Sequence, residues 1–236
     1  MHIRLLILFV LAYAAAHPAP ASGDSLSSHT GVKTVNLDLS EGTWMSLDVS
    51  PDGKFISFDL LNDIYVMPAS GGKAVAIHQG SVAQRSPQFS ADGQFLTYLS
   101  DESGADNVWV SRVDGSEARQ ITQESHAMIA GPAWAADGKS IAAVKTYSDI
   151  FRVRNSEIPL YSLDGTSDEI IVSPPQSGKD VQEPRFSPEG RYLYYTERIG
   201  GDHYVYMNTG LKNFAINKLD LETGKKSRAI SGFGGA

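Results

Sequence analysis

Four acidic residues recur at the same place in a short repeated phrase, and their carboxylates are the first candidates for chemistry in this chain. Each one precedes a glycine, in the pairs Asp52-Gly53, Asp92-Gly93, Asp137-Gly138 and Glu189-Gly190. Clustered carboxylates can hold a metal ion or act as general acid and base. An aspartate in this position also bonds to its own backbone and so stabilises a turn. We expect these side chains to close four separate turns instead of forming one catalytic cluster.

The histidines are the second group that could catalyse a reaction or bind a metal. The chain has six of them and no cysteine, and none belongs to an H-x-H or H-E-x-x-H zinc pattern. The G-x-S-x-G nucleophile turn and the D-x-[DN]-x-[DN]-G calcium loop do not occur. We therefore expect no catalytic residue, no cofactor-binding residue and no metal ligand in this sequence.

One long loop is the best candidate for recognising a ligand. The segment Arg198–Lys212 interrupts a predicted pair of strands and contains Asp202, His203 and Tyr204. Loops carry binding residues more often than the elements they connect. These three residues form the candidate recognition site, and an exposed turn without a ligand is the alternative. His126, in another connection, is expected to be a solvent-facing loop residue.

The acidic phrases divide the chain into repeats. Their glycines stand at 53, 93, 138 and 190, which are steps of 40, 45 and 52 residues. Periods of about 40 to 50 residues with several strands each are typical of β-propeller blades. The sequence predicts an all-β fold, a β-propeller of four-stranded antiparallel blades. Four blades are recognisable, at about 42–80, 81–122, 123–174 and 175–231.

Within each repeat, apolar runs and turn residues predict the strands. Each acidic phrase is expected to form a three-residue hairpin with its glycine at positive φ. In the third repeat we expect a long connection over Thr146–Glu157, and Pro159 is expected to interrupt or begin the third strand, because proline cannot donate a ladder bond. In the fourth repeat, Tyr192, Tyr194 and Tyr195 are expected to pack between blades.

The N-terminus has the pattern of a secretory signal peptide. Met1–Arg4 carries positive charge, Leu5–Ala16 is an apolar stretch of 12 residues, and Ala19–Ala21 is a cleavage site of small residues. We expect residues 1–21 to be removed and the product to be periplasmic or secreted, with an uncleaved anchor as the alternative. Residues 22–41 form an N-terminal segment before the first blade.

The net charge limits the classes of partner. A formal charge of −7 disfavours binding to a nucleic-acid backbone. No segment after the leader has the length of a transmembrane helix. We expect a protein or small-molecule ligand, which the sequence does not identify, no nucleic acid as a partner, and no transmembrane segment once the leader is removed.

The repeats resemble a known family. Ser50–Phe58, Asp63–Gly72 and Phe95–Val110 look like TolB-like, or WD40-like, propeller repeats, and the resemblance covers about residues 40–231. Ile158–Gly165 and Ser231–Ala236 are similar to the propeller half of exported amidohydrolases. The resemblance implies a binding or docking module without its own catalytic centre, with enzyme activity only through a downstream hydrolase domain. Zinc or another divalent metal would belong to that domain. A stand-alone periplasmic interaction propeller of TolB-like type is the alternative.

The resemblance also bears on the number of blades. TolB-like propellers commonly have six or more blades, so four blades imply an incomplete ring with an open edge. The alternative is closure with four blades, in which Val35–Leu39 adds a strand to the last blade.

Overall fold

The computed structural model describes residues 39–148, 154–164, 168–173, 180–198 and 214–231. The chain divides into two units, Met1–Glu41 and Gly42–Ala236. All described strands belong to the second unit, and they confirm the predicted all-β fold with four four-stranded antiparallel sheets. The described residues contain no helix with the length and hydropathy needed to span a membrane.

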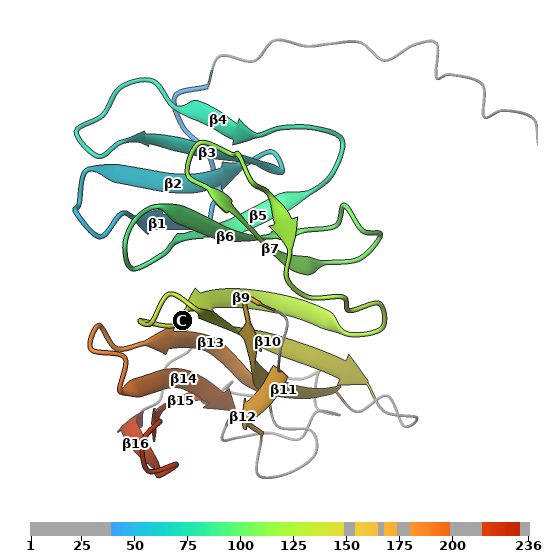
Figure 1. Cartoon of the computed structure of the whole chain (residues 1–236), viewed down its shortest axis with the longest axis vertical. Helices are drawn as coiled ribbons and strands as arrows, with labels where there is room; N and C mark the ends of the chain where they lie inside the picture. The colour runs from blue at the N-terminus through green and yellow to red at the C-terminus, as the bar shows by residue number, and fades with distance from the viewer. Residues whose placement is uncertain (1–38, 149–153, 165–167, 174–179, 199–213, 232–236) are drawn as a thin grey trace, which may run out of the picture. The chain divides into compact units, whose positions relative to one another are not determined.

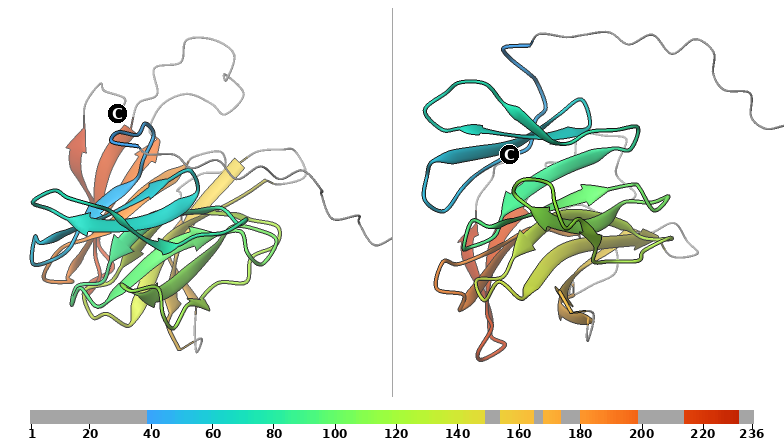
Figure 2. Two further views of the ribbon diagram at one scale, coloured as in Figure 1. Left: turned by 90° about the horizontal axis from the view of Figure 1, so that it is seen from above. Right: turned by 45° about the horizontal axis from the view of Figure 1, so that its top comes forward.

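Each sheet is one propeller blade, and its strands are hydrogen-bonded in chain order (Figures 1 and 2). Blade 1 contains β1 (Leu47–Val49), β2 (Phe55–Leu60), β3 (Asp63–Pro68) and β4 (Val75–His78). Blade 2 contains β5 (Gln84–Phe89), β6 (Phe95–Ser100), β7 (Asn107–Arg112) and β8 (Arg119–Gln120). Blade 3 contains β9 (Met128–Trp134), β10 (Ser140–Ser148), β11 (Arg154–Ser162) and β12 (Asp168–Val172). Blade 4 contains β13 (Val181–Phe186), β14 (Tyr192–Arg198), β15 (Phe214–Asp220) and β16 (Lys226–Ser231).

The hydrophobic core lies between neighbouring blades. Ile64 and Val66 of blade 1 pack against Phe89, Leu96 and Tyr98 of blade 2. Similar clusters join blade 2 to blade 3 and blade 3 to blade 4. Each blade therefore has an incoming face, which contacts the preceding blade, and an outgoing face, which contacts the next one. Alternation along each strand supplies both faces, because successive side chains point to opposite sides.

The acidic phrases form the predicted turns, with one difference in length. Gly53 has a φ of 71°, and its N–H donates to the Ser50 carbonyl at 2.8 Å. Four residues separate Ser50 from Phe55, whose carbonyl accepts from the Ser50 N–H, so the predicted three-residue loop is wrong. The extra residue is accommodated because the Phe55 N–H donates to the Ser50 hydroxyl oxygen at 2.9 Å.

The third blade has longer strands than predicted. β10 continues to Ser148 and β11 begins at Arg154, so most of the expected connection 146–157 is paired sheet. Pro159 does not interrupt β11. The pairing of β11 with β12 shifts its register between Ile158 and Pro159, and such an irregularity lets a strand include a residue that cannot donate.

The tyrosines of β14 lie on two faces of the strand. Tyr195 is 3% exposed and packs in the core between blades 3 and 4, which confirms its predicted role. Tyr192 and Tyr194 are half-buried on the opposite face. Their ring centroids are 6.5 Å apart, and the ammonium of Lys218 lies 4.4 Å from the centre of the Tyr192 ring.

Candidate functional site

The inner strands of blades 2, 3 and 4 each contain an irregularity immediately before a proline. Ser86, Gly131 and Glu183 have φ values of 56°, 54° and 53°, and the pairing with the next strand shifts register around each of them. Ser86 and Glu183 are strained, because a positive φ is unfavourable for a residue with a Cβ. Bulges often redirect side chains beside functional sites. We call this end of the blades the bulge face.

Antiparallel pairing brings other connections to the bulge face. The connection from the second to the third strand and the connection to the next blade both lie there, and hydrogen bonds join them. The Ala83 N–H donates to Asp101 Oδ1 at 2.8 Å, and the Glu124 N–H donates to Asn107 Oδ1 at 2.7 Å. These bonds satisfy backbone groups outside the ladders and fix the loops of the bulge face to the sheets.

The Asp59 side chain forms hydrogen bonds with both blade 1 and blade 2 at the bulge face. Its side chain is buried, and its two oxygens accept from two backbone amides, one just before β1 and one in β5. Oδ1 accepts from the Ser46 N–H at 2.8 Å, and Oδ2 accepts from the Ser86 N–H at 2.8 Å. The carboxylate therefore holds the strained Ser86 backbone in place. The corresponding residues in blades 2, 3 and 4 are Leu99, Val144 and Thr196, so this link belongs to blade 1 alone.

Ion pairs place fixed charges of both signs on the bulge face. They join Arg85 to Asp106, Lys145 to Glu124 and Arg198 to Asp180. The last pair is almost buried, with an Nη2–Oδ2 distance of 3.1 Å. Next to the Lys145–Glu124 pair, burial raises the pKa of the Glu157 carboxyl. The positive charge of Lys145 lowers this pKa, and the negative charge of Glu124 raises it.

Exposed apolar side chains accompany these charges. Trp44 is fully exposed, and Leu61, Met128 and Tyr147 are 66%, 63% and 42% exposed. Trp44 precedes β1, Leu61 lies in the β2–β3 turn, Met128 begins β9 and Tyr147 lies near the end of β10, so all four are at the bulge-face end of their blades. Aromatic and methionine side chains between polar groups are typical of protein-binding surfaces.

The residues singled out in the sequence have different outcomes. Asp202, His203 and Tyr204 lie outside the described residues. Their loop connects β14 to β15, and the flanking pair Arg198 and Phe214 places both ends of the loop at the bulge face. His126 is exposed in the connection between blades 2 and 3, which confirms that prediction. The described residues contain no group of three or more histidine or acidic side chains that could hold a metal ion.

The repeated carboxylates lie at the opposite end of the blades, which we call the turn face. Asp52 and Asp92 accept from the serine two residues earlier and from the amide two residues later. Asp137 accepts from the Lys139 N–H at 2.8 Å. The prediction of separate structural turns is confirmed for these three aspartates.

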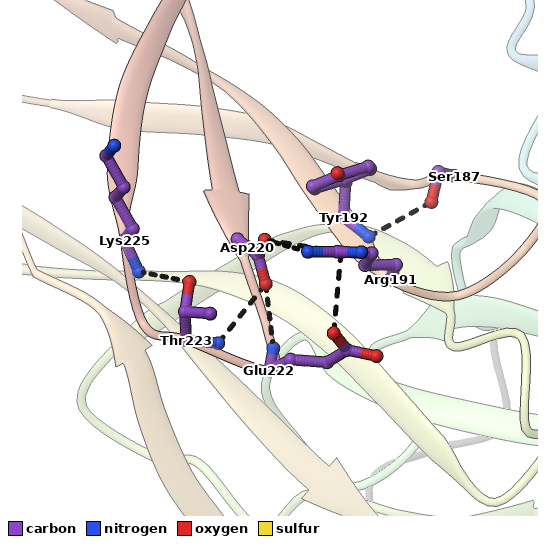
Figure 3. A network of polar contacts seen from close by, with 7 residues as sticks. All are labelled: Ser187, Arg191, Tyr192, Asp220, Glu222, Thr223 and Lys225. Atoms are coloured by element: carbon purple, nitrogen blue, oxygen red, sulfur yellow. Dashed lines mark hydrogen bonds and ion pairs between the residues drawn. The ribbon is translucent and has the colours of Figure 1, made fainter.

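Blade 4 stabilises its turn face in a different way (Figure 3). The Arg191 guanidinium lies between two carboxylates, 2.9 Å from Asp220 Oδ2 and 3.6 Å from Glu222 Oε2. Asp220 Oδ1 accepts from the N–H groups of Glu222 and Thr223. The hydrogen bond with Arg191 lowers the pKa of Asp220. Every member of this network joins strand ends or a turn, so its role is structural.

A histidine–serine pair, which no sequence pattern links, lies between blades 1 and 2. His78 Nε2 is 2.8 Å from the Ser111 hydroxyl oxygen, and its ring centroid is 4.7 Å from that of Tyr98. Burial lowers the pKa of His78, and Glu102 opposes this. Such a distance suits a base and a nucleophile. However, Ser111 is completely buried and its hydroxyl also donates to the Arg112 carbonyl at 3.0 Å, so the pair connects two blades.

Comparison with known proteins identifies the type of repeat. The family described as TolB beta propeller domain matches residues 29–219. An uncharacterized protein of Agrobacterium fabrum is 27% identical over 153 residues, which are 62% of this chain and 52% of that protein. A tricorn protease homolog of Streptomyces coelicolor is 30% identical over 115 residues, which are 49% of this chain and 11% of that protein. The chain thus spans about half the length of the first relative and much less of the second.

A solved structure supports the same architecture. TolB from Acinetobacter baumannii aligns with a TM-score of 0.59 and 19% identity, over 79% of this chain and 43% of that one. At this identity the similarity establishes the fold and not the activity.

Proposed function

Because the chain belongs to the TolB beta propeller domain family, we propose that it is an exported binding module that docks a protein partner on its bulge face. The observation that carries this proposal is the group of exposed apolar residues at one end of the blades, Trp44, Leu61, Met128 and Tyr147. The hydrogen bonds of Asp59 and of the loop connections preorganise that end, which reduces the ordering cost of binding.

The charge of the bulge face suits a polypeptide better than a nucleic acid. Three of the described cations at this face, Arg85, Lys145 and Arg198, have a carboxylate partner, and the chain is negative overall. Phosphate recognition requires cations that remain available for the backbone. A protein can instead place apolar groups on the exposed side chains and polar groups at the paired charges.

The proposed location of this module is the periplasm or the exterior of the cell. The support is the signal-peptide pattern of residues 1–21, together with the relationship to TolB. Fractionation of cells producing the full chain, with mass spectrometry of the N-terminus, tests this part. A product that keeps Met1 in the cytoplasm would contradict it.

A second candidate function is the propeller part of a larger hydrolase. The match to the tricorn protease homolog covers only 11% of that protein, so similar repeats do occur within a much larger peptidase. The resemblance of Ile158–Gly165 to exported amidohydrolases makes an amidohydrolase-like enzyme the preferred form of this candidate. In either form, the bulge face remains the proposed docking surface.

Site-specific photo-crosslinking tests the docking surface. A photoreactive phenylalanine replaces Met128 or Tyr147 on the bulge face, and Asp137 on the turn face as a control. Each variant is incubated with periplasmic extract and irradiated. We expect the same discrete adduct from both bulge-face positions and none from the turn face. Adducts from position 137 alone would overturn the assignment of the face.

A further inference from the structure

Met128 and Tyr147 form a small apolar contact surface at the bulge-face end of blade 3. Met128 is 63% exposed and Tyr147 is 42% exposed, although blade 3 packs against a described blade on each of its two sides. Met128 pairs across the strands with Thr146, the residue next to Tyr147, so both side chains belong to the same end of the sheet. The neighbouring blades therefore leave an apolar surface that a docked partner can cover.

Carboxylates outnumber cations around this contact surface. Arg85, Lys145 and Arg198 each form an ion pair with one carboxylate, so their charges are already compensated. Other carboxylates of the bulge face form no ion pair with a described residue. They are Asp63, Asp101, Glu102, Glu157, Glu183 and Glu197. The described part of the bulge face therefore has an excess of negative charge.

The turn face differs, because it contains exposed cations that no described carboxylate compensates. Lys73, Lys139 and Lys225 are exposed there, and none of them forms an ion pair with a described residue. Charges of one sign that gather on a surface attract partners of the opposite sign. A cationic partner is therefore attracted to the bulge face in preference to the turn face.

The Lys145 ammonium compensates only one of the two carboxylates beside it. Its Nζ lies 2.6 Å from Glu124 Oε1, whereas Glu157 is the cross-strand neighbour of Lys145 in β11 and has no ion pair within the described chain. Burial and the negative charge of Glu124 both raise the pKa of Glu157. A second cation beside Glu157 would relieve the repulsion between the two carboxylates. Tyr147 lies on the same side of β10 as Lys145, so an aromatic ring is close to this position.

We propose that the partner that docks on the bulge face presents a basic segment of polypeptide, in which lysine or arginine side chains are interspersed with apolar ones. A cation of this segment pairs with Glu157, and an adjacent apolar side chain packs on Met128 and Tyr147. The inference rests on the proposed docking function and adds the chemistry of the partner. Charge complementarity of this kind speeds association and excludes acidic competitors, while the apolar contacts remove surface from water.

A basic polypeptide suits these observations better than a metal ion or a small polyamine. The described residues contain no group of three or more histidine or acidic side chains that could hold a metal ion. A polyamine carries charge but has no side chain to cover Met128 and Tyr147. A basic segment with apolar residues satisfies both the charge and the exposed apolar surface.

Fluorescence anisotropy of short labelled peptides with the full chain tests the proposal. The first peptide repeats the unit Lys-Lys-Leu-Leu, the second has glutamate in place of lysine, and the third has serine in place of leucine. We expect the first to bind more tightly than either of the others. Glu157→Gln should weaken its binding by a factor of about 2 to 5, the range for one partly exposed charge pair. Glu189→Gln removes the same charge from the turn face and is the matched control, which should leave binding unchanged.

A second variant tests the apolar half of the contact. Tyr147→Ser should weaken binding of the first peptide and leave binding of the serine peptide unchanged, because only the first has apolar side chains to lose a contact. Thermal unfolding followed by circular dichroism verifies that each variant is folded.

Three results would overturn the proposal. The first is a lysine–leucine peptide that does not bind, or that binds no more tightly than the glutamate peptide. The second is an equal effect of Glu157→Gln and Glu189→Gln, because net charge alone would then be responsible. The third is a serine peptide that binds as tightly as the first, because any small polycation would then suffice.

Failure of this inference is distinguishable from failure of the docking function. Photo-crosslinked adducts at positions 128 and 147 that the lysine–leucine peptide does not displace would retain the docking surface and exclude a basic partner. Absence of adducts would count against the docking function, whereas the peptides are measured without any extract.

Discussion

The side chain of Asp52 illustrates why an acidic residue recurs in the turns. Its Oδ1 accepts from the Ser50 hydroxyl at 2.7 Å and from the Lys54 N–H at 3.1 Å. These bonds stabilise the charged form and lower its pKa to about 2, from an ordinary value of 3.8. The carboxylate is thus adapted to hold a turn, because a general acid or base would need a pKa nearer to the working pH.

Removing the serine hydroxyl should return the pKa of Asp52 toward its ordinary value. In Ser50→Ala the largest contribution to the shift is lost, so the carboxyl should titrate nearer to 3.8. Stability from this group is complete above the unfolded pKa and is lost as the pH falls toward 2. Titration of the Asp52 carboxyl by NMR measures the change. Ser90→Ala is the control and should affect only Asp92. An unchanged pKa in Ser50→Ala would contradict the assigned cause.

His78 provides a second titration at the residue scale. Its pKa lies below 6.5 because the site is partly buried. The folded chain therefore disfavours the charged ring, and the stability linked to it is present above pH 6.5 and lost as the pH falls through the folded pKa. We expect His78→Asn to reduce the loss of stability between pH 7.5 and pH 5, as measured by urea unfolding. His126→Gln, which alters an exposed histidine, should leave that loss as it is. A loss that is the same in His78→Asn and the unmodified chain would refute the effect.

At the scale of elements, the four turns differ in their surroundings although their sequences are similar. Gly53 and Gly190 both have positive φ, at 71° and 76°. A Cβ added at Gly53 would meet no atom within 4 Å, whereas one added at Gly190 would lie 2.9 Å from Ala136 Cβ in the turn of blade 3. The turns of neighbouring blades are therefore in contact at this point.

Alanine substitutions should reveal this contact. Gly53→Ala adds only backbone strain, which costs about 1–3 kcal/mol. Gly190→Ala adds the same strain and a clash, so its free energy of unfolding should fall further. Adding Ala136→Gly should recover the difference without removing the strain, as a double-mutant cycle in urea would show. Equal losses of the free energy of unfolding in the two single variants would mean that the turns of blades 3 and 4 are not in close contact.

At the scale of the whole molecule, the blades depend on one another because the core lies between them. Leu96 belongs to blade 2 but is buried against Ile64 and Val66 of blade 1. A blade that separated from its neighbours would expose two apolar faces. The described blades should therefore unfold as a cooperative unit, in contrast to independent modules that each enclose a core.

Leu96→Ala tests this dependence. The cavity should lower the free energy of unfolding by about 2–5 kcal/mol. The transitions followed by circular dichroism and by the fluorescence of Trp134, in a background with Trp44 and Trp109 replaced by phenylalanine, should shift together, because Trp134 is buried in the next interface between blades 2 and 3. Leu61→Ala, at an exposed turn position, is the control and should change stability little. A fluorescence transition that stays in place while the other shifts would show that the blades unfold separately.

Local features of the fold could be predicted from the sequence because their causes are local. Positive φ at Gly53 and the turn role of Asp52 follow from steric limits and hydrogen bonds that involve only a few neighbouring residues. The repeat length and the alternation of apolar residues then predict four-stranded blades. The extension of β10 and β11 was not predicted, since polar residues such as Thr146, Ser148 and Ser156 give no clear apolar alternation although they pair across the strands.

The surfaces that support function depend on contacts between distant residues, so only the tertiary structure revealed them. The Asp59 carboxylate meets the Ser86 amide 27 positions away, and the His78 ring meets the Ser111 hydroxyl 33 positions away. No local pattern specifies such pairs. Likewise, Leu47 and Ile216, which are 62% and 38% exposed, read as ordinary core residues in the sequence, as do their counterparts in the other blades. Their exposure depends on which blade covers which face, and that is decided by the packing of sheets and not by the residues themselves.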